Sequence, residues 1–191
     1  QNIITRSAVI QNLGDGKIYL EKAQAACLDW LSGDYDLISF YGRHAMERNC
    51  QRMEIKHGTQ VIGSRRGTSS HQYNPMMIVA EHEASEDAGS CYAMSFVYSG
   101  NFKGEVSKDQ FGQTRALLGL SDELFSYPLA SEESFYVPEV ILSYSNTGLA
   151  KLSQNLHQCL RKHVCRGKYR DSVRPVLLNS WEASYFEFNG E

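Results

Sequence analysis

Residues 174–191 begin with the sequence pattern of a short β-strand, and such a strand is stable only when it pairs with other strands of the same sheet. Val176, Leu177 and Leu178 are consecutive apolar residues, the pattern of a strand covered on both faces in a parallel sheet. Pro175 stands directly before them, where a strand tolerates proline. Parallel strands are joined by crossovers of a dozen or more residues. We therefore expect residues 174–191 to be the truncated start of a larger α/β domain.

Most of the chain before residue 146 has the pattern of short β-strands. Apolar or β-branched stretches alternate with polar, glycine-containing turns, at Ile3–Gln11, Lys17–Leu20, Val61-Ile62, Met76–Ala80, Cys91–Tyr98 and Phe135–Ser143. The first two stretches flank Gly14-Asp-Gly16, which predicts a hairpin between them. Pro138 places the last stretch at a sheet edge or at a bulge. The fold class predicted from this pattern is mainly β, with a β-sandwich.

The clearest helix spans about residues 148–164, where apolar residues recur at helical spacing. The stripe consists of Leu149, Leu152, Leu156, Cys159, Leu160 and Val164. Asn146 or Thr147 can cap its start, and Gly167 can terminate it. We expect this helix and the polar residues around it, 146–173 together, to link the sandwich to the domain that starts at residue 174.

Five stretches, in order along the chain, resemble the family 36 glycoside hydrolases, the microbial alpha-galactosidases or melibiases. Residues 174–188 resemble the family stretch R-P-V-L-I-N-N-W-E-A-T-Y-F-D-F, and the departures from it are Leu178, Ser180, Ser184 and Glu187. Phe40–Arg48 is similar to G-R-W-x-x-E-R, with His44 where Trp is usual. Ser64–His71 with Asn74-Pro75 is similar to S-x-R-G-x-S-S-H…N-P, and Tyr98–Phe102 and Pro138-Glu139 complete the set.

The resemblance covers nearly the whole chain and implies a domain arrangement. Residues 1–145 are expected to be part of an N-terminal β-sandwich of the supersandwich type. Residues 146–173 are expected to be a helical linker, and residues 174–191 the first βα unit of a catalytic (β/α)8 barrel. The resemblance also favours a strand for Leu20–Leu31, although its apolar spacing and helix-forming residues favour a helix.

An activity is implied by the same resemblance. A member of this family is expected to remove terminal alpha-galactose from melibiose or raffinose-type oligosaccharides, with retention of configuration and without metal or organic cofactor. Retaining glycosidases use two carboxyl groups about 5–5.5 Å apart, and in this family both are aspartates on later barrel strands. No residue of this chain matches either aspartate, so we assign no catalytic residue and expect the chain itself to be inactive.

Asn179 and Trp181 are the candidate substrate-binding residues. They follow the apolar triplet Val176–Leu178, and residues just past a barrel strand lie on the catalytic face. An aromatic ring stacks on the C–H face of a hexose, while short polar groups bind its hydroxyls. The resemblance implies that Trp181 lines the galactose pocket. The alternative is that Trp181 packs between strand and helix as an ordinary large apolar residue.

Two further groups of side chains are weighed as sites. The metal-like group consists of His157, Cys159, His163 and Cys165, but only Cys159 and His163 share a helix face, so we predict no metal site. Ser69, Ser70 and His71 are adjacent and cannot adopt the geometry of a catalytic triad, so we expect a polar loop whose hydroxyls bond to the backbone. In the same loop, Arg65-Arg66 could contact an anion or carry exposed charge.

Composition bounds the remaining classes of function. The 191 residues are 42% hydrophobic and 21% charged, as in an ordinary globular protein. A net charge of −3 gives no reason to expect nucleic-acid binding, and no apolar run is long enough to span a membrane. Five cysteines at scattered spacing indicate reduced thiols and a cytoplasmic location.

Two alternatives to an enzyme fragment stay open on sequence grounds. One is a non-catalytic, carbohydrate-binding β-sandwich, and the other is a structural sandwich that contacts other subunits. The family resemblance itself implies a homo-oligomer, a tetramer, that acts on alpha-galactoside oligosaccharides.

Overall fold

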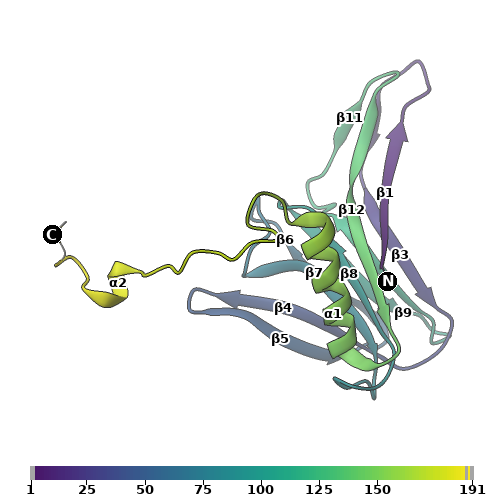
Figure 1. Cartoon of the computed structure of the whole chain (residues 1–191). Helices are drawn as coiled ribbons and strands as arrows, with labels where there is room; N and C mark the ends of the chain where they lie inside the picture. Colours follow the sequence, from purple (N-terminus) through teal and green to yellow (C-terminus); the bar gives the residue numbers. More distant parts are fainter. Residues whose placement is uncertain (1–2, 188, 190–191) are drawn as a thin grey trace. The chain divides into compact units, whose positions relative to one another are not determined.

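A computed structural model describes residues 3–187 and 189, in which antiparallel sheets are followed by one long helix (Figure 1). By the contacts within the chain, residues 1–157 form one unit and residues 158–191 another. The mainly β class predicted from the sequence is confirmed.

The described strands of the first unit form two larger sheets and one small ribbon. A six-stranded sheet has the order β1 (Ile3–Gln11), β12 (Ser134–Ser145), β8 (Cys91–Phe96), β7 (Tyr73–Glu81), β4 (Tyr35–Arg43), β5 (Met46–Glu54). A four-stranded sheet has the order β3 (Gln24–Trp30), β10 (Thr114–Leu120), β9 (Phe102–Lys108), β6 (Gly58–Ser64). The ribbon pairs β11 (Tyr127–Leu129) with β2 (Ile18–Leu20). Neighbouring strands are antiparallel throughout.

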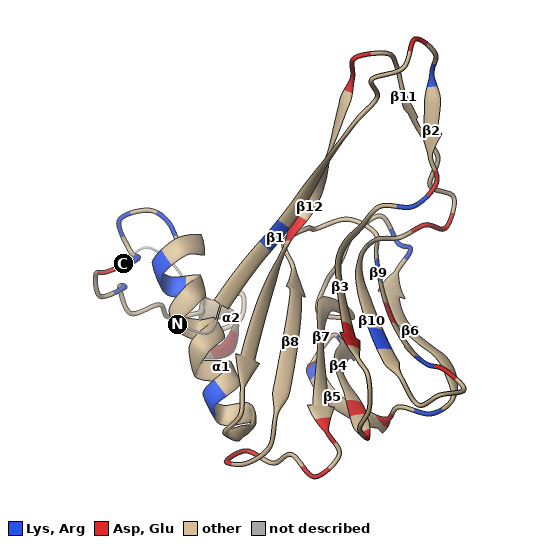
Figure 2. Ribbon diagram, turned by 90° about the vertical axis from the view of Figure 1, so that its right-hand side faces the viewer, with Lys and Arg blue, Asp and Glu red and all other residues tan. Residues whose placement is uncertain are grey.

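The main hydrophobic core lies between the two larger sheets (Figure 2). Alternate residues of a strand point to opposite faces, so every second side chain of each sheet points toward the space between the two sheets. Leu37, Met77 and Met94 of the six-stranded sheet are fully buried, as are Val106 and Leu118 of the four-stranded sheet. These residues belong to one cluster, which makes the pair of sheets a β-sandwich.

Helix α1 (Gly148–Cys159) lies against the outer face of the six-stranded sheet (Figures 1 and 2). Leu152 and Leu156 are buried on it, as the apolar stripe predicts. Buried Ala80 and Ala93 are small residues of β7 and β8 outside the inter-sheet core cluster. Asn155 is also buried, and its Nδ2 donates to the Tyr144 carbonyl of β12 at 3.3 Å.

The predicted ends of the helix are confirmed, since α1 and the turn that follows it span residues 148–164, but the apolar stripe is shorter than predicted and the predicted caps are not what fix the ends. Leu160 and Val164 are 40% and 44% exposed, because after Cys159 the helix widens to a π-helix, η1 (Leu160–Val164), and its faces shift. The chain becomes extended at Cys165, before Gly167. At the other end, backbone carbonyls of the loop after β7 accept the first helical N–H groups, so neither Asn146 nor Thr147 is needed as a cap.

The hairpin predicted around Gly14-Asp-Gly16 is also wrong. β1 pairs with β12, and β2 pairs with β11. The reason is the buried side chain of Asn12, whose Nδ2 lies 3.0 Å from the carbonyl oxygens of Leu129 and Ala130. These bonds tie the turn to the connection between β11 and β12, so partners distant in sequence decide the pairing.

Two other strand predictions are settled by the sheet pairing. Pro138 lies in β12, between β1 and β8, so it marks a bulge and not an edge. The register passes from Arg6↔Val140 to Ala8↔Val137, which leaves one extra residue on β12 at the position where proline has no N–H to donate. The stretch Leu20–Leu31 contains strand β3, as the family resemblance implied.

The start of a barrel is not confirmed by the second unit. Val176, Leu177 and Leu178 are 101%, 90% and 81% exposed and belong to none of the described strands. The expected strand therefore stays a prediction. Phe188, which ends the family-like stretch, and Gly190 and Glu191, the last residues of the predicted barrel start, lie outside the described residues. No described helix has the length and apolar character of a transmembrane span.

Candidate functional site

Asn179 and Trp181 meet at the start of a short helix, α2 (Ser180–Ala183). Asn179 has extended backbone angles, φ −89° and ψ 114°, and its Oδ1 accepts a hydrogen bond from the Trp181 N–H at 3.0 Å. This is the N-cap arrangement, for which asparagine is among the preferred residues. The bond fixes the peptide of Trp181, and with it the direction in which the indole ring leaves the chain.

Three aromatic rings gather around α2, and we call Trp181, Tyr185 and Phe186 the aromatic cluster. The ring centroids of Trp181 and Tyr185 are 5.6 Å apart, and those of Trp181 and Phe186 are 5.0 Å apart. Both pairs are edge-to-face, an arrangement that aromatic quadrupoles favour. The chain folds back after α2 because the N–H groups of Ser184 and Tyr185 both donate to the Ser180 carbonyl.

The sequence reasoning named Trp181 but missed its two aromatic neighbours. The residue pattern held no signal for these contacts, because Tyr185 lies beyond the end of α2, where the chain turns back with a φ of +52°. The three rings are 51%, 62% and 80% exposed, so they do not form a buried core. An exposed ring and the Nδ2 group of Asn179 are chemically suited to a hexose, one for its C–H face and the other for a hydroxyl.

Within the first unit, the family-like stretches meet in space although they are far apart in sequence. The loop of residues 64–71 bonds to the segment of residues 98–102, since the Gly67 N–H donates to Asn101 Oδ1 at 2.7 Å. The Ser69 N–H donates to the Ser99 carbonyl at 2.8 Å, and the Ser69 hydroxyl donates to the Tyr98 carbonyl at 3.1 Å.

The same region includes two more of these stretches. Asn74 Nδ2 donates to the Phe40 carbonyl at 3.3 Å, which joins residues 74–75 to the start of the stretch that leads to Arg48. The Val97 N–H donates to the Glu139 carbonyl at 2.8 Å. The residues that carry the resemblance in this unit therefore belong to one hydrogen-bonded region.

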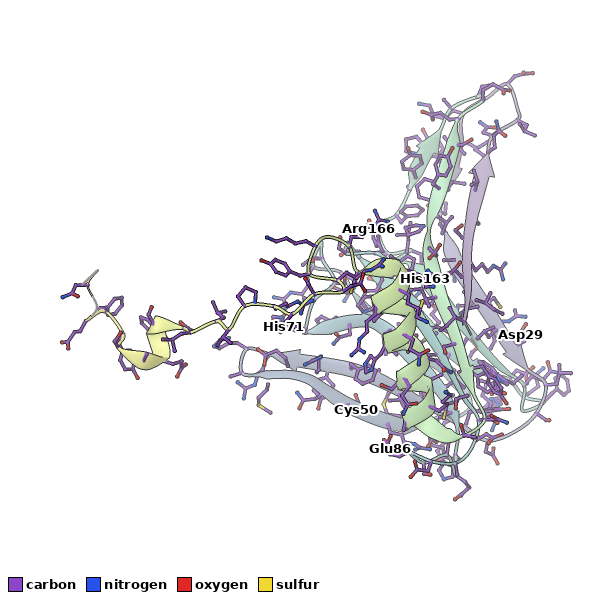
Figure 3. All side chains as sticks on the ribbon, in the orientation of Figure 1. Asp29, Cys50, His71, Glu86, His163 and Arg166 are labelled. Carbon is purple, nitrogen blue, oxygen red and sulfur yellow. The ribbon has the colours of Figure 1, made fainter. Side chains whose placement is uncertain are left out.

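The loop of residues 64–71 is a structural loop, as expected for its serines. Its Ser69 hydroxyl donates to the Tyr98 backbone carbonyl, and His71, labelled in Figure 3, is exposed. Arg65 forms an ion pair with Glu123, and Arg66 donates to the side-chain oxygen of Gln72. Both arginines thus have protein partners at the loop surface.

The histidine and cysteine group near the end of α1 does not form a ligand set. In the part of the chain that the structure describes, no three side chains of His, Cys, Asp or Glu are placed to hold a metal ion. Cys159 is buried, whereas Cys165 is exposed, and both thiols are free. Cys159 thus behaves as a small apolar residue of the helix stripe.

Comparison with known protein families decides the identity of the chain. The profile described as the glycosyl hydrolase family 36 N-terminal domain matches residues 1–130. The profile described as Melibiase matches residues 134–191. The chain belongs to glycoside hydrolase family 36. Within the family, the chain corresponds to the N-terminal region.

Relatives with curated names are alpha-galactosidases. The chain is 64% identical over 190 residues to the bifunctional alpha-galactosidase/sucrose kinase of Mediterraneibacter gnavus. The match covers 100% of this chain and 20% of that protein. It is 43% identical over 187 residues to an alpha-galactosidase of Lactobacillus acidophilus, covering 98% of this chain and 26% of that one. The chain therefore spans about a quarter or less of the relatives that it matches.

Solved structures of the family have the same fold over this region. The galactosidase domain of the alpha-galactosidase-sucrose kinase matches with a TM-score of 0.93 and 64% identity over 98% of this chain and 26% of that one. A family 36 alpha-galactosidase from Geobacillus stearothermophilus, solved in complex with raffinose, matches with a TM-score of 0.93 and 42% identity, with the same coverage of both chains. A complex of that enzyme with stachyose matches equally well.

Proposed function

We propose that this chain is part of an alpha-galactosidase that removes terminal alpha-galactose from melibiose and raffinose-type oligosaccharides, with retention of configuration. The observation that carries the proposal is the 64% identity, over the whole chain, to an enzyme named as an alpha-galactosidase. Support for the substrate class comes from related structures that contain raffinose and stachyose.

The proposed division of labour follows the domain arrangement expected from the sequence. Residues 1–145 are part of the N-terminal sandwich, residues 146–173 are the linker, and residues 174–191 open the catalytic barrel. The two catalytic aspartates belong to the barrel outside these 191 residues, and the reaction uses no cofactor. We further propose that the intact enzyme is a cytoplasmic homo-oligomer, a tetramer in keeping with the family.

Asn179 and Trp181 are the proposed substrate-binding residues of this chain. The cap bond from Asn179 holds the first turn of α2, and the Trp181 ring offers an exposed face beside two other rings. In this proposal the galactose ring stacks on Trp181, and the carboxamide of Asn179 donates to a sugar hydroxyl. Stacking on a fixed ring contributes to binding in the ground state and the transition state alike.

The test is the substitution Trp181→Ala in the alpha-galactosidase that contains this chain. We expect kcat/KM for raffinose to fall about tenfold, since losing one stacked ring costs on the order of 1.4 kcal/mol. Tyr169→Ala is the matched control, because Tyr169 is exposed but lies outside the aromatic cluster. An unchanged kcat/KM in the Trp181 variant would show that the ring serves packing and not the sugar.

The isolated chain separates the enzyme proposal from a carbohydrate-binding module. Hydrolysis of p-nitrophenyl alpha-galactoside should be undetectable, and titration calorimetry with galactose should show weak binding or none, because a pocket needs the other barrel strands. Tight galactose binding by the isolated chain would instead favour the non-catalytic module.

A further inference from the structure

A charged cluster joins three elements at one end of the six-stranded sheet. Asp36 on β4 is buried, with 4% of its surface exposed. Its Oδ2 lies 2.6 Å from Nε of Arg52 on β5, and its Oδ1 lies 2.8 Å from Nδ1 of His82, which follows β7. A buried carboxylate needs such partners, because an unpaired charge inside a protein is costly.

The guanidinium of Arg52 also binds the loop that follows β7. One terminal nitrogen donates to the Ala84 carbonyl at 2.7 Å, and the other donates to the carbonyls of Glu81 and His82 at 3.1 and 2.8 Å. The His82 N–H donates in turn to the Asp34 carbonyl at 3.0 Å. Arg52 therefore fixes the backbone of the start of this loop, residues 82–89, to the sheet.

The same loop holds the first turn of α1. The N–H groups of Gly148, Leu149 and Ala150 donate to the carbonyls of Gly89, Ser85 and Glu86, each at 3.0 Å. These are the N–H groups that a helix leaves without intrahelical partners. Figure 3 labels Glu86 beside this end of α1. Hydrogen bonds at both ends of the loop, joined by its backbone, thus connect Asp36 and Arg52 to the helix.

We propose that Asp36, Arg52 and His82 act as a pH-responsive clasp that holds the loop of residues 82–89 and, through its carbonyl groups, the first turn of α1. The clasp matters because α1 is the segment in which the chain passes from the first unit to the second. This inference is independent of the proposed alpha-galactosidase activity, and it is tested on the chain itself.

The pH response belongs to His82, and the charges that face it are mostly acidic. They are Asp36 on β4, Glu54 and Arg52 on β5, Glu83 in the loop, and Asp34 before β4. The hydrogen bond to Asp36, followed by the charge of Asp36, raises the pKa of His82 above its ordinary value of 6.5.

The direction of the response follows from that raised pKa. A group whose pKa is raised by folding contributes its full stabilisation at pH values below its ordinary pKa. That stabilisation is lost as the pH rises through the raised pKa. The clasp is therefore tightest in mildly acidic solution and loosens toward alkaline pH. Because His82 is half exposed, its contribution is that of a partly screened ion pair.

Hydrogen exchange of the amides of Leu149 and Ala150 in the 191-residue chain tests the clasp. Protection factors, corrected for the intrinsic pH dependence of exchange, should fall about threefold from pH 6 to pH 8, the size expected for a half-exposed ion pair. In His82→Gln, which can still donate to Asp36 but does not titrate, protection should no longer depend on pH.

Two arginine variants make the test specific. Arg52→Lys keeps a cation for Asp36 but cannot reach all three carbonyls, so protection of the first turn should fall at every pH. Arg115→Lys alters an exposed ion pair with Asp29 on the other sheet and should leave α1 unchanged. Equal protection at pH 6 and pH 8 in the wild type, or a pH dependence retained in His82→Gln, would overturn the clasp. Equal effects of the two arginine variants would also overturn it.

Discussion

At the scale of single residues, Gly148 is the described glycine with the least room for a Cβ. Its φ is +83°, a conformation that residues with a Cβ rarely adopt. A Cβ added there would lie 2.3 Å from the Glu86 carbonyl oxygen and 2.6 Å from the Ala88 nitrogen, both backbone atoms. The close approach follows from the hydrogen bonds by which the loop of residues 82–89 holds α1.

Gly148→Ala is therefore expected to lower the free energy of unfolding by about 3 kcal/mol, through the combined cost of the left-handed φ and the backbone clash. Urea denaturation measures the change. Substitutions at two other glycines of the first unit separate the cost of the left-handed φ from the cost of the clash. Gly112→Ala has only the positive φ, +80°, with nothing near its Cβ, and should cost about 1 kcal/mol. Gly16→Ala has neither problem and should be close to neutral. If Gly148→Ala lowers the free energy of unfolding no more than Gly112→Ala, the loop of residues 82–89 moves freely enough to accept the added Cβ.

At the scale of elements, a charge network ties β9 to the segment before β3 and the segment after β10. Lys103 and Glu105 are two residues apart on β9 and point to the same side of the sheet. Lys103 Nζ lies 2.7 Å from Glu105 Oε1 and 3.0 Å from Asp122 Oδ1, and Lys22 Nζ lies 3.1 Å from Glu105 Oε2. The network thus joins the chain before β3 and the chain after β10 through β9.

Lys103→Met tests the network while keeping the aliphatic part of the side chain. We expect a loss of about 1 kcal/mol of unfolding free energy at pH 7, since these side chains are only about a fifth exposed. Burial raises the pKa of Glu105, but hydrogen bonds from Lys103 and Lys22 outweigh it, so the net pKa is lowered. The hydrogen bond from Lys103 also lowers the pKa of Asp122.

The lowered values give the sign of the pH dependence. The stabilisation is fully present above the ordinary pKa values, 4.5 for Glu105 and 3.8 for Asp122. It is lost as the pH falls through the lowered pKa values of the two carboxyl groups. The difference between wild type and Lys103→Met, measured by urea denaturation at several pH values, should therefore vanish in acid. Arg115→Met removes an exposed ion pair with Asp29 that solvent screens, so it should cost less unfolding free energy than Lys103→Met. A difference that persists in acid would assign the effect to packing.

The elements also show what could be predicted from the sequence. Strands with a clear local pattern, such as Ile3–Gln11, and the helix from Gly148 were correctly located. The residues of strand β3 have helical spacing, and only the family resemblance predicted a strand there. The strand forms because pairing with β10 overrides the local propensity. The hairpin was misassigned since nothing local to Gly14 reveals that Asn12 bonds to Leu129 and Ala130.

Prediction of the candidate site was limited for a related reason. The cap bond from Asn179 to Trp181 was not predicted, although it is local and asparagine is a preferred N-cap residue. The edge-to-face contacts with Tyr185 and Phe186 depend on the chain turning back after α2, with φ +52° at Tyr185, which the pattern of residues does not reveal. The expected strand at Val176–Leu178 stays untested, because a parallel strand is stabilised by its neighbours and not by its own residues.

At the scale of the whole chain, the two units differ in how much of their surface is buried. Residues 1–157 contain the inter-sheet core and the first three turns of α1. From Leu160 to Glu187, every described residue is exposed except Ser184, which is intermediate. Backbone that lacks buried contacts opens locally at little cost in free energy, so proteases act there first.

Limited trypsin digestion of the 191-residue chain should therefore cut first after Arg166, Lys168 or Arg170. Arg65 and Arg66 are the matched comparison, since they also lie in an exposed loop, but hydrogen bonds from Gly67 and Ser69 to residues 99–101 fix that loop. We expect cleavage after residues 166–170 to be about tenfold faster, as seen by mass spectrometry of early time points. The large product should keep the far-ultraviolet circular dichroism of a β-protein, because both sheets and the residues of α1 that lie in the first unit remain in it. First cuts at Arg65 or Arg66 would show that the hydrogen bonds of that loop do not protect it. Loss of the β signal with a first cut after residues 166–170 would show that the sandwich needs the second unit.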